Sequence, residues 1–419
     1  MTTEKIKNLL NERLNNHLIV FVAKDFSRGV GLEKFLPNFA IVCGTDSEAI
    51  DIAKSSGINI FCLNEDSEPG SENAGKILES IVSQGYIKDL QKQLSCSKVS
   101  ILTFKGSSKI EFVCKKNNWG YLNLDAKTTT YLEEKANFEK LLKDYDGALL
   151  QTLSGKLKDI NPEILLDQSL EKKLAIQFTH GFAGQSTHFV NYDGFQKLQN
   201  EFPEKKVKVT PYITGETLTL NGCIYNDEVY ISYPFLQKTG DPEFSRHEGG
   251  TCGVIFDKER VLKKVPEEML EKTIKASYAL AENFKKHGLR GFFGFDLVTD
   301  GKEVCPIELN PRLTANIHPF TIQQIAKDLS PFLLLHILEF LNIKTETPAK
   351  EQYLTPLRGE TTSLRNVTDT PFTLNEAKST TSHTFEHLLT NPEIIEMFIL
   401  LKNGQSITPD GRWGEKWSL

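Results

Sequence analysis

The sequence predicts an α/β protein, with a doubly wound parallel sheet at the N-terminus followed by lobes of an α+β type. Short apolar runs alternate with helical patterns over residues 18–124, as they do in βαβ units. From about residue 127 the pattern changes, and residues 207–236 contain successive strands that alternate polar with apolar residues, which is typical of antiparallel sheets. At 419 residues the chain is also too long for one core, so we expect several lobes.

The N-terminal part contains four apolar runs that predict buried parallel strands: "LIVFVA", "AIVC", "INIFCL" and "VSILTF". The capping box "TDSE" at 45–48 predicts the start of a helix that ends at Gly57. "NAGKILESIVSQG" and "KIEFVCKKNNWG" predict two further helices that end at glycine. "GVG" at 29–31 follows the first strand, but the G-x-G-x-x-G pattern is incomplete, so it does not indicate a dinucleotide site.

The later part begins with "TTTYLEEKANFEKLLKDY" at 128–145, which predicts one amphipathic helix. "KKLAIQFTHGFAGQSTHFVNY" predicts a strand, a glycine-containing loop and a returning strand. Residues 207–236 predict antiparallel strands, and a long helix is expected between Pro266 and Gly288. "PFLLLHILEFL" predicts a core helix, because it is too short to cross a membrane.

Composition excludes several classes of protein. The net charge is −6 and no segment gathers Lys or Arg, so we expect no nucleic-acid partner. The seven cysteines are scattered singly without a C-x-x-C pair, which argues against a disulfide framework and a structural zinc site. The first thirty residues lack the order of a signal peptide. We therefore expect a cytoplasmic protein with no membrane partner.

The segment "GFFGFDLVTDGKEVCPIELNPR" at 291–312 predicts a β-hairpin with acids among apolar residues. Glu308 and Asn310 are two residues apart and share one face of their strand. A two-residue turn at 300–301 pairs Asp296 with Cys305 and leaves Glu308 on the opposite face. A three-residue loop with Gly301 left-handed pairs 296 with 304 and brings the three polar groups together. Two carboxylates and an amide suit a hard cation, above all Mg²⁺.

An aspartate on a glycine-rich strand, a glycine-containing turn and then "ELNPR" closely resemble the ATP-grasp ligases. The resemblance implies that Asp296, Glu308 and Asn310 hold one or two Mg²⁺ ions on the phosphates of ATP, with Mn²⁺ as an alternative ion. It also implies that Arg312 lies beside the transferred phosphate or the substrate carboxylate, where a bidentate donor is useful.

The resemblance extends upstream. Lys135 matches the lysine that reaches the α-phosphate, and "FTHGFAGQSTHFV" matches the loop that closes over the phosphates, with Gly181, Gly184 and Ser186 as its binding residues. One position departs from the family. Gln177, with Phe178 as the alternative alignment, stands where these enzymes usually carry a second phosphate-binding lysine, and glutamine brings a hydrogen bond but no charge. Another cation, a glutamine-bearing subgroup and weak ATP binding all stay open as explanations.

"VTPYITGETL" resembles the hinge that reads adenine, which implies roles for Thr210, Pro211, Tyr212 and Ile213. Glu216 matches the ribose-binding acid only with a shift of one residue, because the usual position is Thr217. Arg246, in the loop "SRHEGGTCG", is expected to stabilise an acyl phosphate. We do not expect His180, His188 or His247 to act as a catalytic base.

The resemblance implies an N-terminal α/β domain at 1–126, a small ATP-binding lobe at 127–213, a large lobe with the metal hairpin at 214–345 and a C-terminal extension at 346–419. It implies an ADP-forming ligase that joins a carboxylate, by default an amino acid or peptide, to an amine. Thiol, bicarbonate and phosphate acceptors stay open. So do a regulatory nucleotide-binding protein without turnover, which Gln177 motivates, and a homodimer.

Overall fold

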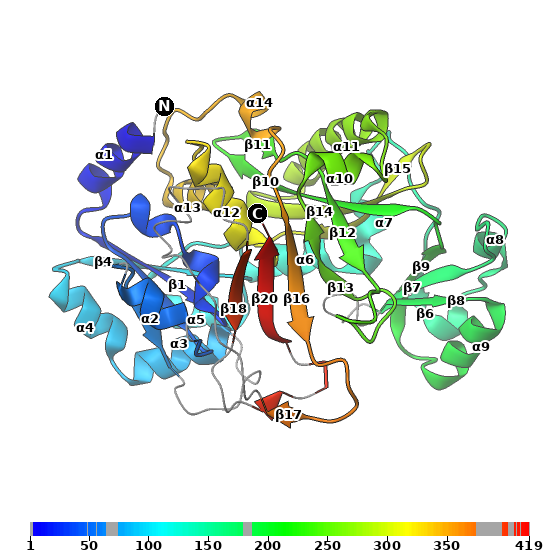
Figure 1. Ribbon diagram of the computed structural model, residues 1–419, viewed down its shortest axis with the longest axis horizontal. Coiled ribbons are helices and arrows are strands. Elements are labelled where there is room, and N and C mark those ends of the chain that lie inside the picture. The colour runs from blue at the N-terminus through cyan, green and yellow to red at the C-terminus, as the bar shows by residue number, and fades with distance from the viewer. Residues whose placement is uncertain are drawn as a thin grey trace.

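The structure is a computed structural model that describes residues 3–47, 49–55, 57–63, 74–178, 187–373, 396–400, 406–407, 409–410 and 412–418. Three lobes lie side by side (Figure 1). The N-terminal lobe, in blue, is at the left, a large lobe is at the centre, and a small lobe of teal and green strands is at the right.

The N-terminal lobe is the predicted doubly wound parallel sheet, with the strand order β3-β2-β1-β4-β5. Its strands are β1 (His17–Ala23), β2 (Phe39–Cys43), β3 (Ile60–Cys62), β4 (Lys98–Thr103) and β5 (Gly120–Tyr121). Its helices are α1 (Thr3–Leu14), η1 (Phe26–Gly29), η2 (Leu32–Lys34), α2 (Ala49–Ser55), α3 (Ala74–Ser83), α4 (Tyr86–Gln93) and α5 (Ser108–Lys116). Strand β1 is buried on both faces, as its uninterrupted apolar run predicts.

The order of these strands reverses between β1 and β4, which is where open α/β sheets place their binding crevices. The helix that follows the predicted capping box starts at Ala49, whose N–H donates to Ser47 Oγ at 3.3 Å. Glu48, the last residue of the box, lies outside the described residues.

The small lobe is an antiparallel sheet in the order β6-β9-β7-β8. It contains β6 (Leu153–Lys156), η4 (Leu157–Asp159), α8 (Glu163–Leu166), β7 (Leu174–Phe178), β8 (Thr187–Val190), α9 (Tyr192–Glu201) and β9 (Lys206–Pro211). One face of this sheet packs on its own apolar cluster, to which Ile176, Val207 and Val209 belong. The alternate residues of the same strands therefore face the other way, toward the large lobe.

The single helix predicted at 128–145 is wrong. The structure instead has α6 (Ala126–Glu133), a short η3 (Lys135–Asn137) and α7 (Phe138–Leu141), separated by an extended residue at Glu134 (φ −63°, ψ 110°). The side-chain amide of Asn137 donates to the carbonyl of Tyr131 at 3.1 Å. In a continuous helix that carbonyl would accept from the N–H of residue 135. The hydrogen bond from Asn137 takes its place and therefore favours the break.

The large lobe is a mixed helix-and-sheet body whose sheet runs β15-β14-β10-β12-β13-β16-β20-β18, with β11 paired to β10. Its strands are β10 (Glu216–Tyr225), β11 (Glu228–Ile231), β12 (Phe235–Thr239), β13 (Thr251–Ile255), β14 (Gly291–Thr299), β15 (Val304–Asn310), β16 (Glu360–Arg365), β18 (Glu396–Leu400) and β20 (Arg412–Ser418). Its helices are α10 (Lys258–Leu262), α11 (Glu267–Lys285), α12 (Ile317–Ala326), α13 (Phe332–Leu341) and α14 (Lys350–Tyr353), and β17 (Phe372–Thr373) pairs with β19 (Ser406–Ile407).

Both registers predicted for the hairpin are wrong. The loop between β14 and β15 has four residues, because Thr299 pairs with Val304, and Asp296 lies opposite Glu308. A regular ladder from that loop would pair Asp296 with Ile307, so a β-bulge inserts Ile307 as an extra residue. Gly301 is left-handed, as expected (φ +86°), although the loop around it is longer. The bulge is thus what places both carboxylates on one face.

The C-terminal segment continues the sheet of the large lobe, with β16 beside β13 and β20 beside β16. Figure 1 shows β16 and β20 in orange and red at the centre of the molecule. The four domain boundaries given above stay predictions. Within the described residues, no helix combines the length and the apolar character needed to span a membrane.

Candidate functional site

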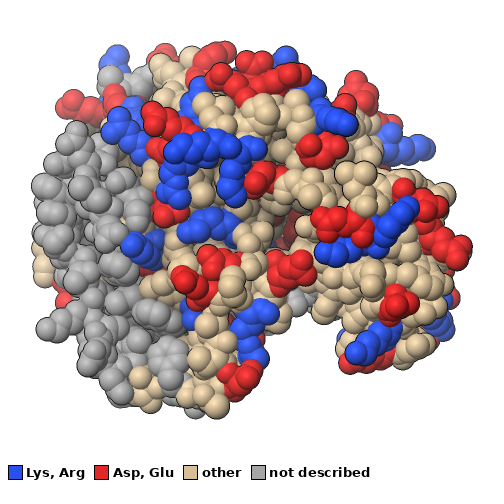
Figure 2. All heavy atoms as spheres, turned by 45° about the vertical axis from the view of Figure 1, so that its right-hand side comes forward, with Lys and Arg blue, Asp and Glu red and all other residues tan. Residues whose placement is uncertain are grey.

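A cleft of about 1030 Å³ lies between the small lobe and the large lobe. Figure 2 shows the small lobe forward at the right and a hollow between it and the rest of the molecule, with acidic and basic side chains interspersed on this face. The cleft is lined by residues of both sheets and of the segments that join the lobes. It also touches Phe104 and Lys105, which follow β4 at the point where the strand order reverses.

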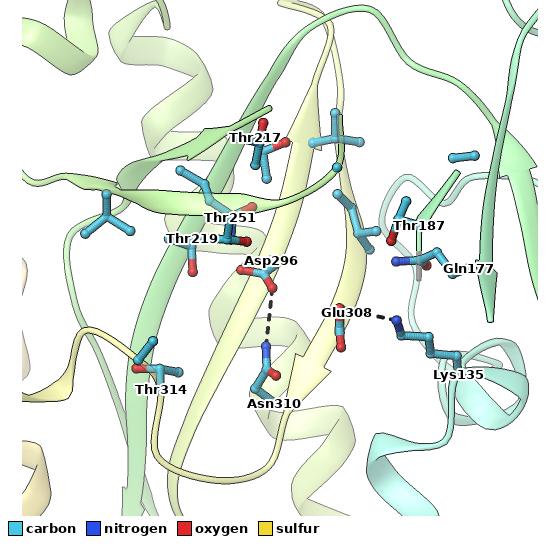
Figure 3. Close-up of a pocket in the computed structure, with 18 of the residues that line it drawn as sticks. Lys135, Gln177, Thr187, Thr217, Thr219, Thr251, Asp296, Glu308, Asn310 and Thr314 are labelled. Carbon is cyan, nitrogen blue, oxygen red and sulfur yellow. Dashed lines mark hydrogen bonds and ion pairs between the residues drawn. The ribbon is translucent and has the colours of Figure 1, made fainter. Parts of the chain in front are cut away.

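The floor of the cleft carries the three predicted metal ligands on neighbouring strands (Figure 3). Asp296 on β14 lies opposite Glu308 on β15, and the Asn310 side-chain amide donates to Asp296 Oδ2 at 3.3 Å. Like charges directly opposite each other on neighbouring strands are destabilising. Burial and the nearby Glu308 carboxylate raise the pKa of Asp296 to about 6.

This arrangement fits a divalent cation. A cation between the two carboxylates would relieve their repulsion, and the amide oxygen of Asn310 is a third hard donor. Among the described residues no group of three His, Cys, Asp or Glu gathers as a metal site, and this set differs because its third member is an amide. The donor chemistry therefore favours Mg²⁺ over zinc or copper.

Lys135 lies across the cleft from this set. Its Nζ is 3.9 Å from Glu308 Oε2, and only 11% of its side chain is exposed. The break after α6 starts the η3 turn on which Lys135 sits. Gln177 and Thr187, neighbours on β7 and β8, extend into the same space from the small lobe (Figure 3).

Arg312 connects the hairpin to the α6 segment. Its Nε donates to Glu133 Oε1 at 3.0 Å and its Nη2 donates to Asn310 Oδ1 at 2.8 Å. Burial alone would raise the pKa of Glu133, but Arg312 and Lys105 lower it. The Arg312 guanidinium lies 5.4 Å from the centre of the Phe104 ring, and the Arg28 guanidinium lies 4.0 Å from the same ring. A fixed cation thus borders the three predicted metal ligands.

The expected adenine hinge lines one end of the cleft, with Thr210 and Pro211 at the end of β9 followed by Tyr212 and Ile213. The backbone of Tyr212 is already used, since its N–H donates to the Lys173 carbonyl at 3.0 Å and its carbonyl accepts from Ser169 Oγ at 3.0 Å. The backbone of Ile213 has no hydrogen-bond partner among the described residues. Ile213 is therefore the hinge residue whose backbone can meet a ligand.

Two predicted residues lie apart from the cleft lining. Glu216 starts β10 and pairs with Lys264, 3.4 Å away, whereas its neighbour Thr217 does line the cleft. Arg246 forms an ion pair with Asp369 and lies 3.7 Å from Asp410. Neither Glu216 nor Arg246 enters the function proposed below.

Three predicted residues of the phosphate loop, Gly181, Gly184 and Ser186, lie outside the described residues, as does His180. His188 forms an edge-to-face contact with Phe178, and His247 lies 3.7 Å from Asp410. These positions leave neither histidine among the residues that line the cleft.

Lys208 is a residue of this site that the sequence did not point to. It is 2% exposed, its Nζ donates to the Ile307 carbonyl at 2.6 Å, and it lies 4.3 Å from the centre of the Phe138 ring. Burial, together with Lys135, lowers the pKa of Lys208 to about 7 against the opposing effect of Glu308. The alternation in its strand indicates only that Lys208 faces away from the core of the two valines beside it, not that another lobe covers it.

The far end of the cleft was missed as well. It is lined by Asn316, by Ser363 of β16 and by Glu415 of β20. Glu415 pairs with Arg412, and Glu415 Oε2 lies 3.0 Å from His318 Nε2. Arg412 in turn lies 4.0 Å from Asp25, just after β1. A partly buried ionic network thus ties the C-terminal strand to the N-terminal lobe beside the cleft.

The chain resembles known proteins over this region and beyond it. Residues 158–316 match the model of the ATP-grasp domain. Among curated proteins none matches the sequence. The biotin carboxylase domain of Hydrogenobacter thermophilus 2-oxoglutarate carboxylase, solved with MgADP, ADP and bicarbonate, is similar in fold (TM-score 0.60, 13% identity, 96% of this chain and 85% of that chain).

Two further solved structures are similar over most of their length. They are the N5-carboxyaminoimidazole synthetase of Staphylococcus aureus complexed with ADP (TM-score 0.56, 12% identity, 96% of this chain and 93% of that chain) and the phosphoribosylglycinamide synthetase of Anaerococcus prevotii (TM-score 0.55, 16% identity, 96% and 93%). At these identities the likeness shows the fold. Residues 158–316, the part of the chain that matches the ATP-grasp domain, span most of the small lobe and the first part of the large lobe.

Proposed function

We propose that this protein is an ATP-dependent ligase that joins a carboxylic acid to an amine through an acyl phosphate, releasing ADP and phosphate. One observation carries the proposal. Two opposed carboxylates, Asp296 and Glu308, face Lys135 across a cleft between two lobes, with Asn310 and Arg312 beside them. Such a site suits the binding of a polyanion and a divalent cation at the same time.

The residues that line the cleft indicate which end of it would bind the nucleotide. Ile213 and Lys135 both line the cleft. In this proposal the open backbone of Ile213 binds the base and Lys135 binds the phosphates. Asp296, Glu308 and Asn310 would hold Mg²⁺, which when bound neutralises charge on the phosphates. The solved relatives named above are complexes with ADP or MgADP in two cases, which supports a nucleotide in this cleft.

The acid lies at the end bordered by Arg312, whose guanidinium is a fixed donor for a carboxylate or a transferring phosphoryl group. A carboxylate oxygen attacks the γ-phosphorus, the bond to the bridging oxygen breaks, and ADP leaves. The amine then attacks the acyl carbon, phosphate leaves with the acyl oxygen, and the nitrogen loses a proton. Arg312 stabilises the negative charge that develops on the phosphoryl oxygens.

The second substrate has room at the far end, where Asn316, Ser363 and Glu415 supply polar groups. Bicarbonate is the main rival to a carboxylic acid, because one relative was solved with it. An amino acid or peptide as the acid, a cytoplasmic location and a homodimer stay predictions.

The test is ADP release from MgATP in the presence of pooled carboxylic acids, amino acids and amines, with bicarbonate in a separate arm. We expect release that requires both an acid and an amine. Asp296→Asn and Glu308→Gln should each lower it by roughly a hundredfold or more. Glu303→Gln changes an exposed acid in the same hairpin and should leave it unchanged.

Release with bicarbonate alone would replace the acid of this proposal with bicarbonate. Magnesium-dependent ATP binding without ADP release from any pool would instead support a regulatory nucleotide-binding protein.

A further inference from the structure

Lys208 lies directly beside Gln177, the position that lacks the family's usual lysine. In the sheet of the small lobe Gln177 pairs with Lys208 on β9 and with Thr187 on β8. Paired residues of an antiparallel sheet point to the same side, so these three side chains form one row across the face that looks toward the large lobe. The charge absent at position 177 is thus present one strand away.

The ammonium of Lys208 is held at the joint between the two lobes. It donates to the carbonyl of Ile307, the residue that the bulge inserts, and Ile307 itself lines the cleft. The lysine stem crosses the Phe138 ring of α7, and only 2% of the residue is exposed. A buried ammonium is costly unless hydrogen bonds and opposite charge compensate it.

The charged groups that face Lys208 come from two elements, and a third element presents a neutral side chain. Glu308 of β15 follows the carbonyl that Lys208 binds, Lys135 of η3 lies 3.9 Å from Glu308, and Gln177 of β7 is neutral. One carboxylate, that of Glu308, therefore lies near two lysines. Polyanionic phosphates in the same cleft would add the negative charge that two ammonium groups can match.

We propose that Lys208 is a positioning residue that supplies, from β9, the positive charge that Gln177 does not supply from β7. The inference rests on the proposed function, since it needs ATP in the cleft. Lys208 acts by its charge at the phosphate end and by fixing the Ile307 carbonyl, which sets where the neighbouring Glu308 points. This differs from a lysine at position 177, because Lys208 is not itself among the residues that line the cleft.

The experiment measures equilibrium binding of MgATP to the full chain by calorimetry. Lys208→Met keeps the length and apolar stem of the side chain but removes its charge. We expect it to weaken MgATP binding at least about tenfold, because an opposite charge is lost from a poorly solvated site. Adding Gln177→Lys to Lys208→Met moves the charge back to β7 and should recover most of that loss.

Two further variants keep the result interpretable. Lys206→Met makes the same change at an exposed position two residues earlier on β9, and should bind MgATP like the wild type. Gln177→Lys alone places two ammonium groups opposite each other, so it should lower stability and bring no tighter binding. This single variant tests the proposal even where Lys208→Met does not fold.

The proposal is overturned if Lys208→Met binds MgATP like the wild type. It is also overturned if Gln177→Lys alone tightens binding tenfold, or if a folded Lys208→Met is not rescued by Gln177→Lys. Absence of MgATP binding by the wild type would overturn the proposed function and this inference together. The wild-type arm therefore separates the two failures.

Discussion

Asp296 and Glu308 lie opposite each other on the neighbouring strands β14 and β15. The raised pKa of Asp296, about 6, arises from burial and then from repulsion by Glu308. An aspartate whose folded pKa lies above its unfolded value binds a proton on folding. Ionisation of Asp296 therefore lowers the free energy of unfolding as the pH rises from about 4 to about 6, and above that range the whole loss remains.

We predict that Asp296→Asn stabilises the metal-free protein while it removes the effect of magnesium. At about pH 7 and with a chelator present, the free energy of unfolding should rise by roughly 1–3 kcal/mol, because one of two opposed charges is gone. Urea denaturation measures this change. Adding Mg²⁺ and ATP should stabilise the wild type but not the variant. A variant less stable than the wild type in chelator would contradict this account of the hairpin.

His336 is a second residue whose protonation matters. Its Nδ1 accepts from the Phe292 N–H at 2.8 Å, so Nε2 carries the proton and donates to the Leu122 carbonyl at 2.8 Å. Burial lowers the pKa of His336 to about 4. Because this pKa lies below the unfolded value, the stability it contributes is complete above about pH 6.5 and is lost as the pH falls toward about 4.

His336→Asn should therefore change how stability depends on pH. The asparagine can still accept from Phe292 but does not titrate. We expect it to be less stable than the wild type near pH 7, and to lose about 3 kcal/mol less than the wild type between about pH 7 and pH 4. Parallel unfolding curves at several pH values give the difference. Equal losses in both proteins would show that His336 is not the titrating group.

The sequence could predict that Asp296, Glu308 and Asn310 lie together, but not that Lys208 is buried beside them. Asp296, Glu308 and Asn310 stand in a fixed order around a turn, and order and spacing are properties of the sequence. Lys208 was hidden because its strand, "VKVTP", alternates like any half-exposed strand. Only the packing of the large lobe onto that face turns a lysine expected in solvent into one that is 2% exposed.

The β14–β15 hairpin depends on a turn and a bulge. Gly301 adopts φ +86°, and a Cβ added there would meet no atom within 4 Å. Gly301→Ala should thus lower the free energy of unfolding by about 1 kcal/mol through backbone strain alone, and Gly301→Asn by less. MgATP binding should remain at the wild-type level. Chemical denaturation and calorimetry check both, and a loss of binding would show that the loop itself forms part of the site.

The bulge explains why the register could not be predicted. Turn length sets the register of a regular hairpin, and neither a two-residue nor a three-residue turn allows for an extra residue further along the strand. Ile307 carries no sequence signal for a bulge, since it is an ordinary strand residue. Its extra carbonyl is satisfied by Lys208, from another lobe. A tertiary contact between distant residues therefore helps to fix a local feature.

At the scale of the whole molecule, the last strand ties the lobes together. Trp417 of β20 is fully buried, and its ring lies 4.4 Å from the ring of His318 on α12. Trp417→Ala should lower the free energy of unfolding by roughly 3–5 kcal/mol, because it leaves a large cavity in the core. Trp119→Ala, at a partly exposed tryptophan, should cost clearly less. Equal effects in thermal unfolding would mean that β20 contributes little to the core.

The central claim is that the cleft forms an acyl phosphate, and hydroxylamine trapping tests it most directly. Hydroxylamine replaces the amine, so the protein with MgATP and pooled carboxylic acids should produce hydroxamate and ADP in equal amounts. Asp296→Asn should produce neither. ADP formed without hydroxamate, or hydroxamate that persists in Asp296→Asn, would contradict the account.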